Sequence, residues 1–183
     1  LVNRTSNDGE IINLRKDGTT VGSIGVYAGG TRLTIGTANT GIVFADEIDT
    51  IFPIDLSANS ISDATVNLGV SNGRFKDLYL SGTANVANVK ETVYALTGTA
   101  LDAGNGGIQT KTLAANTTFT DSLASGESLV LQLEAGASYT VTWPTMQWVT
   151  SGGNTAPTLT AKDTLVFWKV SSTLYGAYTG SYV

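Results

Sequence analysis

The sequence predicts an all-β protein made of two units joined by a short linker. Short apolar runs recur along the whole chain, and turn-forming residues such as Gly, Asn and Asp separate them. The rear half shows no amphipathic helical pattern. Aromatic residues become denser and charged residues sparser beyond about residue 82. We therefore expect a front unit over residues 1–82, a linker or neck over 83–96 and a rear unit over 97–183.

The composition is that of a folded protein with few charges. The 183 residues are 42% hydrophobic with a mean hydropathy of +0.10, which argues against a disordered chain. Charged residues make up only 14%, whereas an ordinary globular protein has about 25%. Glycine is abundant, with 21 residues. A polar but weakly charged surface of this kind suits extracellular β-structure and fibres.

The residue types that are missing exclude several functions. The chain has no Cys and no His, so disulfides, thiolate or imidazole metal sites, and Ser-His-Asp or Cys-His catalysis are ruled out. The net charge is −5 and the basic residues are interleaved with acids, which disfavours nucleic-acid binding. No apolar run reaches about 18 residues, so we expect no membrane insertion. We expect neither enzymatic activity nor a cofactor.

The front unit is predicted to be a series of short strands. Asp17-Gly18 lies between two short alternating runs, and this pair readily adopts the positive φ angles of a tight hairpin turn. We expect a second reversal at residues 28–31 and a polar tether over residues 1–8. The expected strands cover residues 11–15, 20–24, 26–27, 32–35, 41–44 and 51–54.

A cluster of acids follows the fifth of these strands. Asp46, Glu47 and Asp49 could together bind a hard cation such as Ca²⁺ if other oxygen ligands joined them. The alternative, which we favour, is a solvated acidic loop. The same acids could in principle supply a glycosidase pair, but nothing else in the chain supports that chemistry. We therefore predict no metal site, with these three residues as weak candidates.

The stretch over residues 66–82 is predicted to be a turn followed by a strand. Residues 71–73, Ser-Asn-Gly, indicate the turn. Residues 74–80 then alternate, with Phe75 and Tyr79 on one face and Leu78 and Leu80 on the other. Because both faces carry apolar groups, we expect this strand to be covered on both sides.

The front unit has few large apolar side chains for so many short, Gly-rich strands. A small unit buries a smaller share of its surface and is marginal alone. Without Cys and His, neither disulfides nor structural metal sites with thiolate or imidazole ligands can stabilise this unit. Oligomerisation is the remaining source of stability. We expect apolar side chains to meet the same residues of sister chains. The expected interface residues are Phe75, Leu78, Leu80, Val86, Val89 and Val93.

The linker has two interpretations. Val86, Val89, Val93 and Leu96 are spaced 3, 4 and 3 residues apart, which is the spacing of a coiled-coil seam. A helix this short is marginal by itself, and Val is a weak helix former. The sequence therefore leaves open a short helical neck or an extended linker in which Tyr94 and Leu96 start the next sheet.

The rear unit is predicted to be a small β-sandwich or jelly roll. Its strands are expected over residues 108–113, 117–120, 128–134, 139–143, 164–170 and 174–178. Alternation places Leu129, Leu131 and Leu133 inward on one strand. It likewise places Tyr139, Val141 and Trp143 inward on the next.

Aromatic residues near the C-terminus are the candidates for recognition. Trp143 and Trp168 fall inside expected strands and are assigned to the core. Trp148 falls in an expected loop near Asn154, so it is either a packed lid or an exposed ring that stacks on a sugar while amides bind its hydroxyls. Tyr175 and Tyr178 are a second pair of candidates, with subunit packing around a trimer axis as the alternative.

Two segments resemble a known family. Residues 68–82 read Leu-Gly-x-Ser-x-x-Arg-Phe-Lys-Asp-Leu-Tyr-Leu-Ser-Gly, which resembles a segment that recurs in fibre and tail-fibre proteins of tailed bacteriophages, notably marine ones. Residues 14–25 resemble the segment that usually precedes it, and this likeness covers roughly residues 1–90. From Tyr94 onward, residues 139–144 and 167–170 are similar to a C-terminal domain found on such fibres.

The resemblance implies a homotrimeric structural protein of the virion that acts outside the host cell. It implies an intertwined or β-prism-like front module and a C-terminal domain that contacts a host-surface glycan or protein. Other virion proteins would be further partners. Two alternatives remain open, namely a head fibre or capsid decoration protein without a receptor role, and a polysaccharide-degrading tailspike.

Overall fold

The protein is all-β, as the sequence predicted. The structure is a computed structural model that describes residues 7–183, and it divides into two compact units between Thr83 and Ala84. Helical structure in the described part consists of three short 3-10 turns, η1 (Asp46–Ile48), η2 (Ala103–Asn105) and η3 (Gly136–Ser138). Over residues 7–183, no helix is long and apolar enough to cross a membrane.

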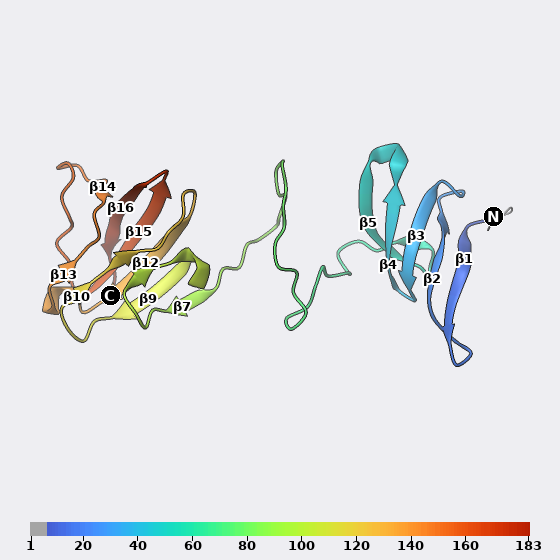
Figure 1. Cartoon of the computed structure of the whole chain (residues 1–183), viewed down its shortest axis with the longest axis horizontal. Helices are drawn as coiled ribbons and strands as arrows, with labels where there is room; N and C mark the ends of the chain where they lie inside the picture. Colours follow the sequence, from blue (N-terminus) through green and yellow to red (C-terminus); the bar gives the residue numbers. More distant parts are fainter. Residues whose placement is uncertain (1–6) are drawn as a thin grey trace. The chain divides into compact units, whose positions relative to one another are not determined.

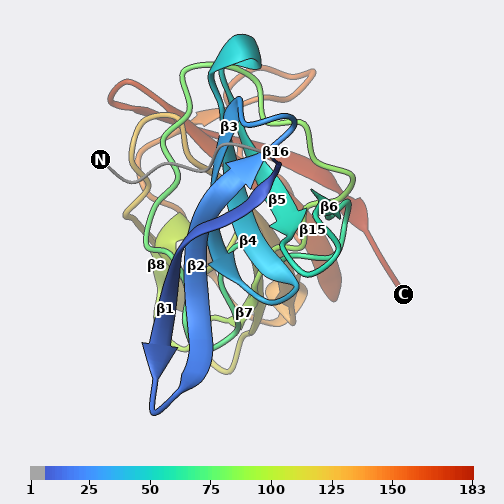
Figure 2. The same cartoon turned by 90° about the vertical axis from the view of Figure 1, so that its right-hand side faces the viewer.

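The front unit is an antiparallel meander in a single six-stranded sheet (Figure 1, Figure 2). Neighbouring strands in the chain are neighbours in the sheet. The Asp17-Gly18 hairpin is confirmed, because both residues have positive φ, 51° and 81°, and the flanking residues Lys16 and Thr19 pair. The strands are β1 (Gly9–Lys16), β2 (Thr19–Tyr27), β3 (Arg32–Thr37), β4 (Thr40–Ala45), β5 (Thr50–Asp55) and β6 (Ser60–Ile61).

The expected tether at residues 1–8 falls mostly on residues 1–6, which lie outside the described residues. Asp8 is fixed, because its carboxylate accepts hydrogen bonds from the backbone N–H groups of Gly29 and Gly30, at 3.0 and 2.8 Å. This carboxylate thus caps the β2–β3 turn, where a second reversal was predicted. The tether prediction is wrong for Asp8.

Strand register places two apolar rows on one face of the meander. Partners directly opposite each other in an antiparallel sheet share a face, so the pairing of the strands defines each row. The first row contains Ile12, Ile24, Ile35, Ile42 and Pro53, and the second contains Val26, Leu33, Phe44 and Ile51. We call these nine residues the apolar face.

The opposite face of the meander has its own small core. Val43 and Ile54 are fully buried there and Ala45 is 2% exposed, with Leu56 packed against them. Leu56 can approach because its Cδ1 lies only 3.0 to 3.1 Å from where a Cβ on Gly36 or Gly41 would stand. The segment that directly follows β5, with Leu56, therefore covers this face. The apolar face on the other side stays open.

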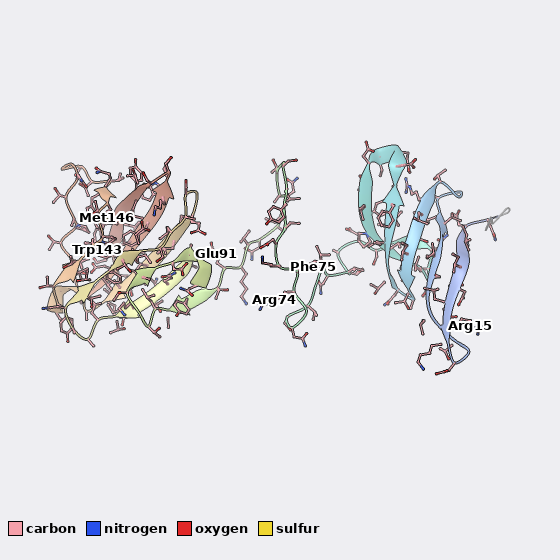
Figure 3. The ribbon with its side chains drawn as sticks, viewed as in Figure 1. Arg15, Arg74, Phe75, Glu91, Trp143 and Met146 are labelled. Atoms are coloured by element: carbon pink, nitrogen blue, oxygen red, sulfur yellow. The ribbon has the colours of Figure 1, made fainter. Side chains whose placement is uncertain are left out.

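Residues 62–92 contain no strand and no helix, apart from one isolated bridge between Val70 and Gly73. The predicted turn at residues 71–73 is confirmed, because Val70 and Gly73 exchange backbone hydrogen bonds of 3.1 and 3.0 Å across it. The strand predicted over residues 74–80 is wrong. Figure 3 shows Arg74 and Phe75 on ribbon without a strand.

The rear unit contains one six-stranded sheet and two parallel strand pairs. The large sheet has the order β14-β16-β15-β12-β9-β7, and the pairs are β10-β13 and β11-β8. Its β15–β16 hairpin is antiparallel, whereas β9 pairs in parallel with both β7 and β12. The strands are β7 (Val93–Ala95), β8 (Ala100–Leu101), β9 (Ile108–Thr112), β10 (Thr117–Thr118), β11 (Thr120–Asp121), β12 (Ser128–Glu134), β13 (Val141–Thr142), β14 (Gln147–Trp148), β15 (Lys162–Val170) and β16 (Thr173–Ser181).

The linker is extended and does not form the helical neck that was the other interpretation. No helix occurs over residues 83–96, and β7 lies inside this range. β7 pairs with β9, so the rear sheet begins at Val93, next to the Tyr94 of the extended interpretation and before the unit boundary predicted at residue 97. Isolated helices of this length are marginal, and the pairing with β9 stabilises the strand instead.

The rear core lies on the inward face of the large sheet. Leu129, Leu131 and Leu133 on β12 are at most 2% exposed, which confirms the alternation predicted for this strand. Tyr139 is 36% exposed and precedes a strand of only two residues, so its predicted inward position is wrong. The other buried members are Leu96, Leu101, Leu113, Phe119, Leu123, Met146, Trp148, Leu165, Phe167 and Leu174.

A buried carboxylate ties the β15–β16 hairpin to the loop before it. Asp163 is fully buried. It accepts hydrogen bonds from the Thr160 backbone N–H at 2.8 Å, the Thr160 hydroxyl at 2.7 Å and the Tyr178 hydroxyl at 3.1 Å. Burying a polar group is costly unless hydrogen bonds replace its hydration, and these three donors do so.

We expect Asp163→Ala to destabilise the rear unit by about 2–4 kcal/mol, because three part-buried hydrogen bonds would be lost and a gap would be left beside the core. Asp163→Asn keeps an acceptor oxygen and should cost less. Urea unfolding followed by tryptophan fluorescence isolates this unit, since all three tryptophans, Trp143, Trp148 and Trp168, lie within it.

The matched control is Asp102→Ala, which removes a carboxylate that accepts one hydrogen bond in a turn, from the Gly104 N–H at 2.9 Å. Similar unfolding midpoints for Asp163→Ala and Asp102→Ala would contradict the role given to Asp163.

Candidate interaction surfaces

Trp148 is part of the rear core and does not present an exposed ring. It is 8% exposed and packs edge-on against Trp143, with ring centroids 5.5 Å apart, and against Phe167, at 6.1 Å. Its ring also covers Gly176, where an added Cβ would lie 3.0 Å from Trp148 Cζ3. The expectation of a sugar-stacking platform at Trp148 is therefore wrong, and the packed alternative is the one observed. Trp143 and Met146 from the same core are labelled in Figure 3.

Asn154 has a structural role in the same loop. Its side-chain Oδ1 accepts a hydrogen bond of 2.6 Å from the Trp148 backbone N–H. The next N–H along, that of Val149, donates to the Gly176 carbonyl at 2.8 Å. Asn154 thereby fixes the loop to the end of β14, the Val149 hydrogen bond holds β14 against β16, and the ring of Trp148 lies in the core.

Tyr175 lies on the outward face of the large sheet, where it stacks on Trp168. The ring centroids are 5.6 Å apart and the planes differ by 10°. Trp168 is half-buried, so its predicted place in the core is wrong. Register places Ser128 beside Trp168 and Gln147 beside Tyr175. This row combines two aromatic rings with a hydroxyl and an amide.

Tyr178 points to the other side of the sheet. It is half-buried against the core, and its hydroxyl donates to Asp163. Of the four residues expected to bind a glycan, Trp148 and Tyr178 thus face the core, Asn154 is exposed but holds its own loop, and Tyr175 remains the aromatic contact candidate on the outward face. Sequence alternation could have separated the two tyrosines, since residues 175 and 178 fall on opposite faces of a regular strand.

The acids at residues 46–49 do not form a cation site. Among residues 7–183, no group of three or more Asp or Glu side chains is placed to hold a metal. Asp46 and Glu47 lie in η1, and Glu47 pairs with Arg32. A hydrogen bond from its own backbone N–H and then the Arg32 guanidinium lower the pKa of the Glu47 carboxyl below its usual value. Glu47 therefore completes an ion pair on the side of the meander opposite the apolar face.

The residues expected at an oligomer interface are all uncovered within the single chain. Their exposed fractions range from 56% for Leu80 to 73% for Leu78. Tyr79, in the same stretch, is 89% exposed. Large apolar side chains this exposed over a continuous stretch are typical of surfaces that bind a partner. The six residues are Phe75, Leu78, Leu80, Val86, Val89 and Val93.

The apolar face of the meander is a second uncovered surface, and it was not predicted from the sequence. Six of its residues are between 36% and 64% exposed, and the nine carry no charge. Full burial of a large apolar side chain contributes about 1.5–3 kcal/mol, so covering these six would add roughly 4 to 8 kcal/mol per copy. A whole small domain is stable by only about 5–15 kcal/mol. The six are Ile12, Leu33, Ile35, Ile42, Phe44 and Ile51.

We expect Trp148→Ala to destabilise the rear unit by about 3–5 kcal/mol, because it leaves a cavity between Trp143 and Phe167. Tyr175→Ala should cost only about 1 kcal/mol, since it removes one stacked ring at the surface. Urea unfolding followed by circular dichroism measures both. Equal, small losses for the two variants would contradict the burial of Trp148.

Comparison of the chain with protein-family models, with curated proteins and with solved structures gave no match. Its function therefore has to be argued from its own residues and surfaces.

Proposed function

We propose that this chain is a structural component of a phage virion fibre, with a rear unit that contacts the host surface. The observation that carries the proposal is the continuous stretch of exposed apolar residues from Leu68 to Val93. In a single chain such a stretch exposes apolar surface to water and favours aggregation. In a shaft of several chains the copies can bury this surface against one another.

Two further features support a fibre. Residues 68–82 contain this exposed stretch, and they are also the residues whose pattern resembles phage fibre proteins. The low charge content of 14% leaves few groups to repel when several chains pack side by side. We propose a homotrimer on the basis of that resemblance.

The rear unit is suited to a position at the end of such a fibre. Its core has thirteen buried hydrophobic residues, so it folds around its own side chains. Its outward face offers the stacked Trp168 and Tyr175 between Ser128 and Gln147. Aromatic rings with neighbouring amides and hydroxyls can bind a glycan or protein of the cell surface. The proposed role is binding and not catalysis.

Immunogold labelling of virions of a phage that encodes this chain tests the proposal. We expect the label on tail fibres, because the rear unit would be exposed there. We also expect the purified chain, added in excess to host cells, to slow phage adsorption several-fold, since it would occupy the same receptors.

The control is the same chain denatured by heat, which should leave adsorption unchanged. Label on the head, without an effect on adsorption, would favour a head fibre or decoration protein. Absence of label from intact virions, with the chain present in infected cells, would contradict a virion role.

A further inference from the structure

The apolar face lacks the second layer that a sheet of this kind requires. Ile35 pairs with Ile42 and Leu33 pairs with Phe44, so four large side chains stand together at the centre of the meander. Each of these four is between 36% and 44% exposed. A sheet with one apolar face is stable only when that face packs against another element.

The chain itself covers only a corner of this face. Residues 66–69 and Phe75 line a hollow of about 630 Å³ together with Ile35, Ile42 and Pro53. The hollow remains open, and Leu68 and Phe75 are 79% and 68% exposed beside it. The described part of the front unit therefore supplies no second layer.

The chemistry of the face specifies an apolar partner. None of its nine residues is charged, so an anionic surface or an ionic peptide would find no complementary group there. Arg32 contacts Glu47, Tyr27 and Phe52 on the opposite side, and the acids Asp46 and Asp49 only border the face, at the edge formed by Phe44 and Ile51. The partner must present a flat apolar surface of its own.

The partner must also be present whenever the front unit is folded. The covered side of the meander buries only Val43, Ala45 and Ile54 as hydrophobic residues, which is a small core for a unit of 83 residues. A second copy of the chain meets both requirements, because it is made at the same time and carries the same uncharged rows.

We propose that the apolar faces of sister copies pack against one another, so that the core of the front unit is completed between chains. This inference rests on the oligomer of the proposed function and names the surface through which its copies join. Ile35, Ile42, Leu33 and Phe44 lie at the centre of the contact.

Cysteine crosslinking tests this contact in the full chain. The protein has no cysteine, so any disulfide formed by a single-cysteine variant must join two copies. We would compare Leu33→Cys, Ile35→Cys, Ile42→Cys and Phe44→Cys under mild oxidation on non-reducing gels. At least one of these central positions should give tenfold more crosslinked dimer than the control, Asn39→Cys, which is exposed in the β3–β4 turn.

A second variant guards against loss of folding. Ile42→Asp places a charge in the contact and should reduce the solution mass to that of one copy. The tryptophan fluorescence should stay unchanged, because all three tryptophans report on the rear unit.

The outcomes separate this inference from the proposed function. A multi-copy protein in which no central cysteine crosslinks above the Asn39→Cys control would overturn the inference and leave the fibre role intact. An Ile42→Asp protein that keeps its multi-copy mass would also overturn it. Strong crosslinking at a central position, without label on virions, would support the contact and remove the virion role.

Discussion

The structure depends on one constraint, which is that an apolar face of a β-sheet must pack against another layer. The front unit meets this on one side only, where Leu56 folds over Gly36 and Gly41 to enclose Val43 and Ile54. On the other side, two rows of aliphatic and aromatic side chains remain open. The exposed apolar residues that follow, from Leu68 to Val93, also lack a covering layer.

The rear unit meets the same constraint within its own chain. Thirteen buried hydrophobic residues fill its core, against three in the front unit, although the two units are of similar length. Aromatic packing of Phe119, Trp143 and Phe167 fills the space under the large sheet. In the proposed fibre, the front unit would therefore serve association between copies and the rear unit would present a surface.

The sequence predicted those elements whose cause is local. The Asp17-Gly18 hairpin and the inward leucines of β12 follow from turn chemistry and from period-two alternation. Alternation does not make a strand where no neighbouring backbone is available to pair, and this is why residues 74–80 show the pattern without the strand. Strand direction is also invisible to alternation, so the parallel pairing of β9 with β12 was not predicted.

The candidate contact residues were predicted less well, because their roles depend on packing over long sequence distances. Trp148 follows a proline and precedes a polar loop, yet its ring packs inward. It can do so because Gly176, far along the chain, has no side chain to occupy that space. Two of the donors to Asp163 come from the nearby Thr160, but the third, Tyr178, lies on the next strand and reaches Asp163 only through the β15–β16 pairing. The apolar face emerged only from strand register, which joins isoleucines of four separate strands into one row.

The most direct test of the account is the solution mass of the full chain by sedimentation equilibrium over a wide dilution series. The account predicts a multi-copy mass, near three times the 19.0 kDa of one chain, and a loss of front-unit strand structure when dilution releases single copies. A chain that is single-copy at every concentration, with the front unit folded and cooperative in its unfolding, would contradict it.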